Sequence, residues 1–501
     1  MKIESVRSLR GPNLWSNQPV LEVLASFDAA SELPLAHRIA QRALEMQRAI
    51  GSAVTYCEAR PVSDRQCRLL VQYAEEEVGK RAVELAFAHP NVPPEEVGEL
   101  LALKSLAEDV RLGPSTGSIV RAAEQRGIPA RRLTSGSLVQ FGFGSRMRRI
   151  WASETDRTSA VGEAIAQDKE LTKNLLAAIG VPVPEGHVCK TAEEAWTAAL
   201  AIGLPVAVKP RKGNQGKGVS TSLSSKEAVV TAFEIAVGHD GETIVERHLN
   251  GADHRLLVIG DRLVAAARRE PPSVVGDGSC TISQLVAQEN LNPLRGDDHS
   301  TSLSKLRLDA IGLEHLAEQG LNAESVPAAG QKVSLRRNAN LSTGGSAADV
   351  TDSVHPEVAA RAIEAARMVG LDVAGIDIVA TRIDQPLEVT RGAIVEVNAA
   401  PGLRMHLEPS AGKGRAVGEA IVDMMFKAGD DARIPVVAVT GTNGKTTTTR
   451  CIAHILARTG LRVGMTCTDG IYVENRRIDT GDCSGPKSAR AVLGHPRVDA
   501  A

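Results

Sequence analysis

The chain is poor in aromatic residues, and it also lacks a strong charge of either sign. Phe, Trp and Tyr together make up 2% of its 501 residues, which leaves little material for the stacking surfaces that bind single-stranded nucleic acid. The formal net charge is −2, whereas general nucleic-acid binders are usually strongly basic. We therefore expect no nucleic-acid partner.

Long hydrophobic runs and paired cysteines are missing as well. No stretch of about 18 apolar residues occurs, and the opening MKIESVRSLRGPN has no apolar core of a signal peptide. The seven cysteines are scattered, with no CxxC pair and no zinc-ligand spacing, so we expect reduced, mostly buried thiols. These absences predict a cytoplasmic protein without membrane contact.

What is present is an ordinary globular composition arranged in three blocks. We expect an amino-terminal α/β domain at 1–158, a second domain at 159–427 and a third at 434–501 after a polar linker. In the first block, 35–50 and 66–90 repeat apolar residues at helical spacing, 113–129 reads as a capped helix and LVQFGFG (138–144) as a strand. In the second block, helices alternate with strands predicted at 205–210, 242–249, 253–270, 373–381 and 392–402. The run 253–270 is typical of a hairpin that turns at Gly260-Asp261.

The second block contains a lysine followed by a glycine-rich loop, VKPRKGNQGKGVS (208–220). Lys209 would end a strand, and the loop contains Gly213, Gly216 and Gly218. Glycines let backbone N–H groups approach phosphates, and a lysine adds a positive charge. A flexible surface turn can have the same composition, so this loop alone is weak evidence for a nucleotide site.

Two later strands of the same block carry oxygen-donor side chains among apolar residues. Asp377 lies in GIDIV, and Glu396 and Asn398 lie two apart in VEVNAAPG, on one face of a strand. Hard oxygen donors of this kind suit Mg²⁺ that bridges nucleotide phosphates. A single such carboxylate could equally be a strand-end residue in water, but three together favour a metal site.

The third block opens with VVAVTGTNGKTTTTR (436–450), which is typical of a strand, a phosphate loop and a helix. Val439 stands where the strict P-loop pattern requires glycine. The loop residues are Gly441, Thr442, Asn443, Gly444, Lys445 and Thr446. A helix over 445–460 would present its N-terminus to the anion.

The central block resembles the ATP-grasp superfamily, which joins a carboxylate to an amine through an acyl phosphate. The whole chain resembles the cyanophycin synthetase family, on the stretches RSLRGPNLWS, LGPSTGSIVRAAEQRGIP, GADHRLLVI, VVGDGSCTISQLV, RNANLSTGG and VEVNAAPGLRMH. TGTNGKTTT looks like the Mur-ligase form of the phosphate loop. The resemblance implies an α/β and α+β multidomain fold, with a central ATP-grasp domain and the start of a P-loop Mur-ligase-like domain at the C-terminus.

The resemblance also implies roles for matching residues. Lys169 in DKELTK and Lys209 would contact ATP phosphates beneath the loop 213–218, and Glu246 in IVERHL would lie at the hinge on the adenine side. Asp377, Glu396 and Asn398 would hold Mg²⁺; in the third block Lys445 would reach the phosphates and Thr446 would bind Mg²⁺. The reacting carboxylate and phosphoryl group would face the stretch RRNANLSTGG, through Arg337, Asn340, Ser342, Gly344 and Gly345. His254 and Arg255 would lie on the substrate side, although His254 also fits a structural histidine and Lys169 a helix-surface charge.

The implied activity is ATP-dependent ligation in cyanophycin synthesis. The ATP-grasp half would add L-aspartate to the backbone carboxylate of a cyanophycin primer, and the Mur-like half would add L-arginine. We expect residues 434–501 to be an incomplete domain, from a fragment or a truncated chain, that is inactive alone. The resemblance implies a homo-oligomer. Two alternatives stay open: an ATP-grasp peptide ligase of the glutathione-synthetase kind, and a non-catalytic partner that binds the polymer.

Overall fold

The computed structural model describes residues 1–28, 33–211, 218–292, 294–296 and 303–501. The chain divides into two compact units, Met1–Leu112 and Gly113–Ala501, and each is described by itself. This division does not test the domain limits predicted near 158 and 427, which stay predictions.

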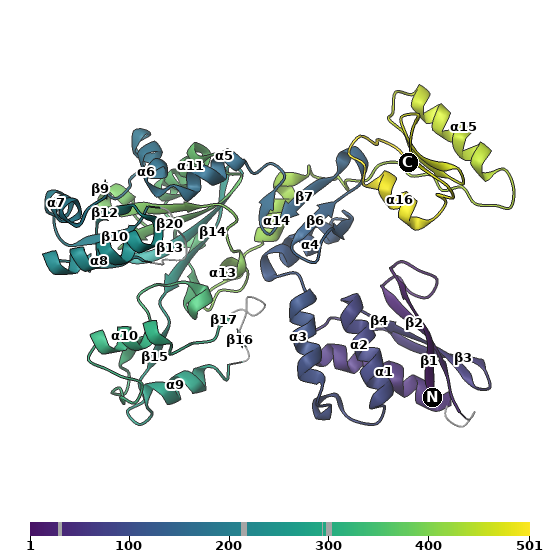
Figure 1. The fold of residues 1–501 in the computed structure, drawn as a ribbon, viewed down its shortest axis with the longest axis horizontal. Coiled ribbons are helices and arrows are strands. Elements are labelled where there is room, and N and C mark those ends of the chain that lie inside the picture. The colour runs from purple at the N-terminus through teal and green to yellow at the C-terminus, as the bar shows by residue number, and fades with distance from the viewer. Residues whose placement is uncertain (29–32, 212–217, 293, 297–302) are drawn as a thin grey trace. The chain divides into compact units, whose positions relative to one another are not determined.

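The first unit is an antiparallel sheet with helices packed on one face (Figure 1). Its strand order is β1-β2-β4-β3, with β1 at Lys2–Leu9, β2 at Val20–Ser26, β3 at Cys57–Ser63 and β4 at Gln66–Gln72. The helices are α1 (Leu33–Ala49), α2 (Glu76–Ala88) and α3 (Leu100–Val110). Leu21 and Val23 of β2 and Leu69 of β4 pack against Ile39 of α1, because alternate residues of a strand point to the same face.

The predicted helix over 66–90 is wrong in its first part. Residues Gln66–Gln72 form strand β4, and the helix begins only at Glu76. Cys67, Leu69 and Val71 alternate into the core beneath α1. A short apolar run followed directly by a helix does not reveal by periodicity where one element ends and the next begins.

The second unit opens with helix α4 (Pro114–Gln125) and a sheet of order β5-β6-β7-β8. These strands are Ala130–Arg132, Leu138–Phe141, Arg148–Trp151 and Glu154–Thr155; the strand predicted in LVQFGFG is thus present as β6. Helix α14 (Val417–Met425) returns to pack on α4, and Arg126 forms an ion pair of 2.9 Å with Asp423. The segment after the central block therefore closes back onto the segment before it.

Two sheets make up the central part of this unit. The smaller has the order β11-β10-β12-β9, from Ser220–Leu223, Val206–Pro210, Thr243–Arg247 and Gly186–Cys189. Helices α7 (Ala192–Ile202) and α8 (Lys226–Asp240) cover it.

The larger sheet has the order β19-β14-β13-β20-β21. Its strands are Ser346–Asp349, Arg262–Glu270, Ala252–Ile259, Val373–Ala380 and Ala393–Asn398. The predicted hairpin turn at Gly260-Asp261 joins β13 to β14. Helices α5 (Ala160–Gln167), α6 (Lys169–Ala178) and α11 (Pro356–Val369) lie over one face (Figure 1), where Leu256, Ile376 and Ile378 pack against α11. The intervening strand residues, such as Asp377, therefore face the other side.

A small subdomain is inserted between β14 and β19. It contains β15 (Ser273–Val275) paired with β18 (Lys332–Ser334), β16 (Arg295–Gly296) paired with β17 (Leu303–Ser304), and helices α9 (Ile282–Glu289) and α10 (Ala310–Glu318). It has its own core of residues such as Ile282, Leu316 and Val333. Helices α12 (Leu387–Thr390) and α13 (Arg404–Leu407) flank β21 in the chain.

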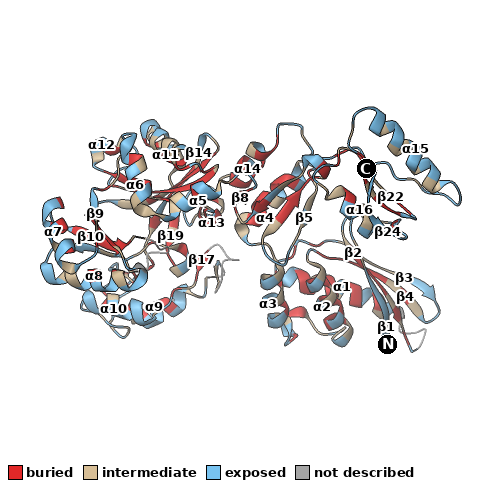
Figure 2. Ribbon diagram, turned by 45° about the horizontal axis from the view of Figure 1, so that its top comes forward, coloured by how far each residue is buried: buried red, intermediate tan, exposed pale blue. Residues whose placement is uncertain are grey.

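The C-terminal part contains α15 (Lys445–Arg458), α16 (Pro486–Leu493) and a sheet of order β22-β23-β24, from Gly464–Cys467, Gly470–Val473 and Arg476–Thr480. The strand predicted to precede the phosphate loop is wrong, because residues 436–440 form no strand. Val437 N donates to Ala501 O at 2.9 Å, but no neighbouring strand among the described residues extends this pairing into a ladder. None of the residues of α15 is buried (Figure 2), whereas the residues of β20 are almost all buried.

Among the described residues, no helix is long and apolar enough to cross a membrane. The seven cysteines are all free thiols, as expected, and four of them are buried.

Candidate active site

A cavity of about 1240 Å³ lies on the face of the larger sheet that the helices leave open. The smaller sheet, the inserted subdomain and the start of α4 complete its walls. Its lining includes the charged and polar residues Lys169, Lys209, Asp253, Arg255, Arg269, Arg337, Asn340, Ser342, Asp377, Glu396, Asn398 and Arg404. Residues from strands and helices far apart in sequence thus share one space.

At one end of the cavity, buried lysines surround a glutamate. Glu246 on β12 is 2.5 Å from Lys209 Nζ and also accepts from Lys173 on α6. Burial lowers the pKa of Lys209 to about 8. Burial and the neighbouring positive charge of Lys209 also lower the pKa of Lys173. Removing ammonium groups from water favours their neutral form, and the negative charge of Glu396 opposes this lowering of the pKa at both lysines.

The Glu246 side chain pairs with two lysines and is not among the residues that line the cavity. The adenine-side role stays a prediction. Lys173, in contrast, is missing from the sequence-based set, although its position four residues after Lys169 places both lysines on one face of a helix.

Lys169 lies at the first position of α6, directly after the capping residue Asp168. The Asp168 carboxylate accepts from the backbone N–H of Leu171 at 3.1 Å, which fixes the start of the helix. Lys169 Nζ is 3.6 Å from Glu396 Oε1, and both side chains line the cavity. The structure therefore brings a predicted phosphate-binding lysine next to a predicted metal ligand.

Asp377 occupies the centre of the larger sheet's open face. In register it pairs with Arg255 on β13 and with Glu396 on β21. Arg255 donates to both carboxylate oxygens, one of them at 3.0 Å, and Arg269 Nη2 is 3.1 Å from Oδ2. Burial alone would raise the pKa of Asp377, but these two arginines outweigh it and hold the pKa below its ordinary value.

Arg269 is itself held by a second carboxylate that the sequence does not single out. Its guanidinium donates to Asp253 at 2.7 and 2.9 Å. Asp253 and Arg269 are directly opposite in the β13–β14 register. Two arginines and two aspartates, of which Asp253 is 34% exposed, thus form one charge network on the cavity floor.

The three predicted metal ligands fit a magnesium ion by type and position. Asp377, Glu396 and Asn398 all line the cavity, and the Asn398 side-chain nitrogen is 3.4 Å from Asp377 Oδ2. No cluster of three or more His, Cys, Asp or Glu side chains suited to a metal occurs in the described ranges, so the third donor would be the amide oxygen of Asn398. Two carboxylates and an amide are ligands that Mg²⁺ accepts. The Asp377 oxygens would then contact both the ion and the guanidinium groups of Arg255 and Arg269.

The predicted acid-side residues are partly brought together. Arg337, Asn340 and Ser342 line the cavity, and Arg337 is also 2.5 Å from Glu318. Gly344 and Gly345 lie behind them in the turn: Gly344 has φ +96°, and a Cβ on Gly345 would lie 2.8 Å from Asn340 O. These two glycines shape the segment rather than line the cavity.

His254 is not brought to the cavity with the other candidates. Strand alternation places it on the opposite face of β13 from Asp253 and Arg255. It is buried, its Nδ1 has no hydrogen-bond partner in the described part of the chain, and burial lowers its pKa to about 4. It is a neutral histidine packed inside the sheet layer at pH 7.

Of the predicted flap glycines, Gly213 and Gly216 lie outside the described residues. Gly218 is described and has φ +69°, and a Cβ there would lie 2.6 Å from the His239 ring. Glycine is therefore required at 218 by backbone conformation and by space.

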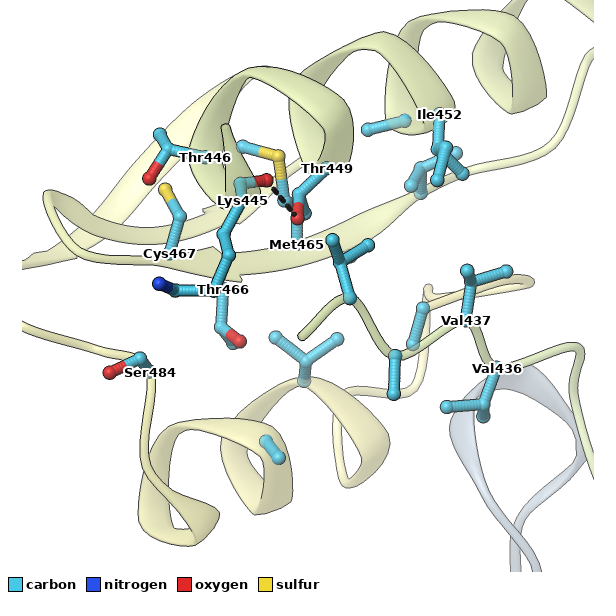
Figure 3. Close-up of a pocket in the computed structure, with 18 of the residues that line it drawn as sticks. Val436, Val437, Lys445, Thr446, Thr449, Ile452, Met465, Thr466, Cys467 and Ser484 are labelled. Carbon is cyan, nitrogen blue, oxygen red and sulfur yellow. Dashed lines mark hydrogen bonds between the residues drawn. The ribbon is translucent and has the colours of Figure 1, made fainter. Parts of the chain in front are cut away.

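A second, smaller cavity of about 270 Å³ lies beside the phosphate loop (Figure 3). It is lined by Val436 and Val437, by Lys445, Thr446 and Ile452 of α15, and by residues such as Met465. Gly441 and Gly444 have positive φ, and Thr442 and Asn443 lie exposed between them. Lys445 Nζ donates to Gly441 O at 2.7 Å, and the Thr446 hydroxyl is 3.0 Å from that of Thr468. The six predicted residues are therefore continuous: Gly441 to Gly444 precede α15, and Lys445 and Thr446 are its first two residues.

Comparisons with known proteins agree with this geometry. An ATP-grasp domain model matches residues 162–248, and a Mur ligase middle domain model matches residues 439–493. The crystal structure of a bifunctional glutathione synthetase from Pasteurella multocida is similar to this chain, with a TM-score of 0.50 and 30% identity, over 70% of this chain and 49% of that one. The fold and the site thus define an ATP-grasp protein that also contains a Mur ligase middle segment.

Within that class the chain is similar to cyanophycin synthetases over its whole length. It is 38% identical to cyanophycin synthetase of Trichormus variabilis over 100% of this chain and 61% of that protein. It is 40% identical to cyanophycin synthetase of Synechocystis over 93% of this chain and 55% of that protein. The chain therefore spans less than two thirds of the length of these relatives.

Proposed function

We propose that this chain is an ATP-dependent carbon–nitrogen ligase that extends the aspartate backbone of cyanophycin. The observation that carries this proposal is the single cavity in which Lys169 and Lys209 face Asp377, Glu396 and Asn398. Similarity to cyanophycin synthetases over the whole chain supports the choice of substrates. These are L-aspartate and the C-terminal carboxylate of a cyanophycin primer.

The chemistry needs activation because a carboxylate does not react with an amine at neutral pH. ATP would supply a phosphoryl group that converts the acid into an acyl phosphate, and Mg²⁺ held by Asp377, Glu396 and Asn398 would neutralise phosphate charge. For such a transfer a protein supplies mainly positioning and charge. Lys169 and Lys209 provide positive charge at the phosphate end, and Arg337, Asn340 and Ser342 bind at the acid end.

The remaining assignments are parts of the same proposal. Residues 439–493 would serve the addition of L-arginine to the aspartate side chain, with Lys445 and Thr446 at the phosphates. The protein would act in the cytoplasm as a homo-oligomer. Gly213 and Gly216 would cover the nucleotide as part of the flap.

A ligase of the glutathione-synthetase kind is the second candidate, because the Pasteurella structure shares the fold over 70% of this chain. The two candidates differ in substrate. The first requires aspartate and a polymer primer, and the second requires a small thiol-containing dipeptide.

The test is phosphate release and product mass with each substrate set. We expect release with ATP, Mg²⁺, L-aspartate and primer, and an increase in primer mass by aspartyl units. Glu396→Ala removes a metal ligand at the cavity surface rather than a core contact, so it should abolish turnover and leave the melting temperature nearly unchanged. The control is Glu364→Ala, an exposed carboxylate on α11 paired with Arg361, which should behave like the wild type. Normal turnover in Glu396→Ala would show that the metal site is misassigned.

A further inference from the structure

The chain that follows the metal-ligand strand β21 forms a loop that returns to the far edge of the same sheet. From Pro401 to Ala416 it passes through α13 and then runs beside the edge strand β19. Asp349 N donates to Ala411 O at 2.9 Å, and Ser410 N donates to Ala347 O at 2.7 Å. The Ser410 hydroxyl in turn accepts from Ala347 N at 3.0 Å. The loop thus adds backbone hydrogen bonds to β19.

A charged clasp secures the end of this loop. The Arg415 guanidinium donates to both oxygens of Asp349, with Nε 3.0 and 3.1 Å away, and to both oxygens of Asp352 at 2.9 Å. The side chain of Asp349 is 8% exposed and that of Asp352 is 64% exposed. Two carboxylates of very different burial therefore hold one arginine, and the buried ion pair is screened least by water.

The same loop is also closed on itself. Arg415 N donates to His406 O at 2.8 Å. A Cβ at Gly414 would lie 2.4 Å from Leu407 O, and a Cβ at Gly412, where φ is +91°, would lie 2.9 Å from Asp349 Cβ. The two arms of the loop approach each other and β19 so closely that movement of Arg415 would move α13.

The inner side of the loop carries two residues that line the large cavity. Met405 packs in a small cluster with Leu341, Ala267 and Ala347. Arg404 is buried yet lines the cavity, and its Nη2 donates to the Ser304 hydroxyl at 3.2 Å. Leu341 lies between Asn340 and Ser342, so the loop packs directly against the acid-side segment.

We propose that Asp349 and Arg415 are positioning residues of the ligase. By fixing the loop 401–416 they hold Met405 against Leu341 and Arg404 against Ser304, and so they set the affinity for the acid and amine substrates rather than for the nucleotide. This inference rests on the proposed function. Lys169 and Lys209, at the nucleotide end of the cavity, lie on α6 and β10.

The kinetic test compares Asp349→Asn with Asp352→Asn, which removes the exposed partner of the same arginine. Misplacement of a substrate-binding segment by about 1 Å can cost up to about 100-fold in rate. We expect Asp349→Asn to raise KM for aspartate or primer at least about tenfold, with KM for ATP within about twofold of the wild type. Asp352→Asn should leave all three values near the wild type, and Arg415→Lys should restore part of the loss seen in Arg415→Ala. A KM for ATP that rises as much as the others, or unchanged substrate KM values, would overturn the proposal.

A second measurement, the rate of cleavage by trypsin, tests how firmly the loop 401–416 is held and does not depend on enzymatic activity. Trypsin cleaves after arginine and lysine, and we expect the clasp to protect the bonds after Arg404 and Arg415, whereas the exposed Lys413 is left out of the comparison. We expect Asp349→Asn to be cleaved at these sites several-fold faster than the wild type and Asp352→Asn to be cleaved at the wild-type rate. Equal cleavage of all three would contradict the clasp. If the wild type shows this protection but ligates none of the substrates, the proposed function fails and the positioning of the loop stands.

Discussion

At the scale of single residues, the buried histidines make stability depend on pH in a predictable direction. Burial lowers the pKa of His254 to about 4 from 6.5. Between these values the unfolded chain binds a proton that the folded chain does not, so the free energy of unfolding falls as pH falls from 6.5 to 4. The slope is about 1.4 kcal/mol per pH unit, or roughly 3 kcal/mol in total.

The substitution His254→Gln removes this titration. We expect urea unfolding, followed at several pH values between 4 and 7, to show a slope shallower by about 1.4 kcal/mol per pH unit in the variant. A difference in the free energy of unfolding that is the same at all pH values would reflect packing alone. The quantity to compare is therefore the slope of the free energy of unfolding against pH. His315→Gln is the control, because His315 pairs with Glu318 on the surface of the inserted subdomain. An unchanged slope in His254→Gln would mean that His254 is protonated in the folded state.

The sequence predicts single ligands at this scale better than it predicts their partners. Asp377, Glu396 and Asn398 stand out because a carboxylate or amide inside an apolar strand is rare without a reason. One partner of Glu246 is Lys173, 73 positions earlier, and no local pattern links the two. The pairing of Asp253 with Arg269 cannot be predicted from the sequence for another reason. A regular hairpin that turns at Gly260-Asp261 would pair Asp253 with residue 268. A bulge at Leu257–Val258 shifts the register by one residue, so Asp253 pairs with Arg269 instead.

At the scale of elements, the packing of α14 on α4 depends on one glycine. A Cβ at Gly418 would lie 2.7 Å from the backbone oxygen of Ser118, and backbone atoms cannot move aside as a flexible side chain can. Gly418→Ala should therefore push the two helices apart and lower the free energy of unfolding by about 1–3 kcal/mol.

The matched control is Gly238→Ala in α8, where nothing lies within 4 Å of an added Cβ. Alanine there should stabilise the helix by about 0.5–1 kcal/mol. Urea unfolding should therefore show a lower free energy of unfolding for Gly418→Ala and a higher one for Gly238→Ala than for the wild type. A neutral or stabilising effect of Gly418→Ala would show that α14 and α4 pack less closely than described.

The errors in predicting elements have one physical origin. Residues 66–72 look helical by apolar spacing but form β4, because their partners β2 and β3 are available. Residues 436–440 look like a strand but form none, since no ladder within the described parts of the chain continues beside them. Strand formation depends on distant partners, whereas the helices that begin at caps such as Thr281 and Ser225 are set by nearby residues.

At the scale of the whole molecule, the two nucleotide-type sites differ in how deeply their supporting elements are buried. Lys209 and Asp377 of the ATP-grasp site lie on strands β10 and β20, whose residues are nearly all buried. The phosphate loop instead begins α15, which has no buried residue. Elements with few buried contacts open at low free energy, so the second site is expected to be the less rigid one.

Hydrogen exchange measures this difference directly. We expect the amides of α15 to exchange on the order of 100-fold faster than those of β20, since local opening spans the whole range from near zero to the global free energy. Addition of ATP and Mg²⁺ should slow exchange in Lys169–Ala178 and Val206–Pro210, where the ATP-grasp lysines lie. The Glu396→Ala variant serves as the control and should show little of this added protection, because a metal ligand is lost. If α15 exchanged as slowly as β20, its exposed surface would have to be covered in solution. The prediction that the phosphate-loop site is less rigid than the ATP-grasp site would then be wrong.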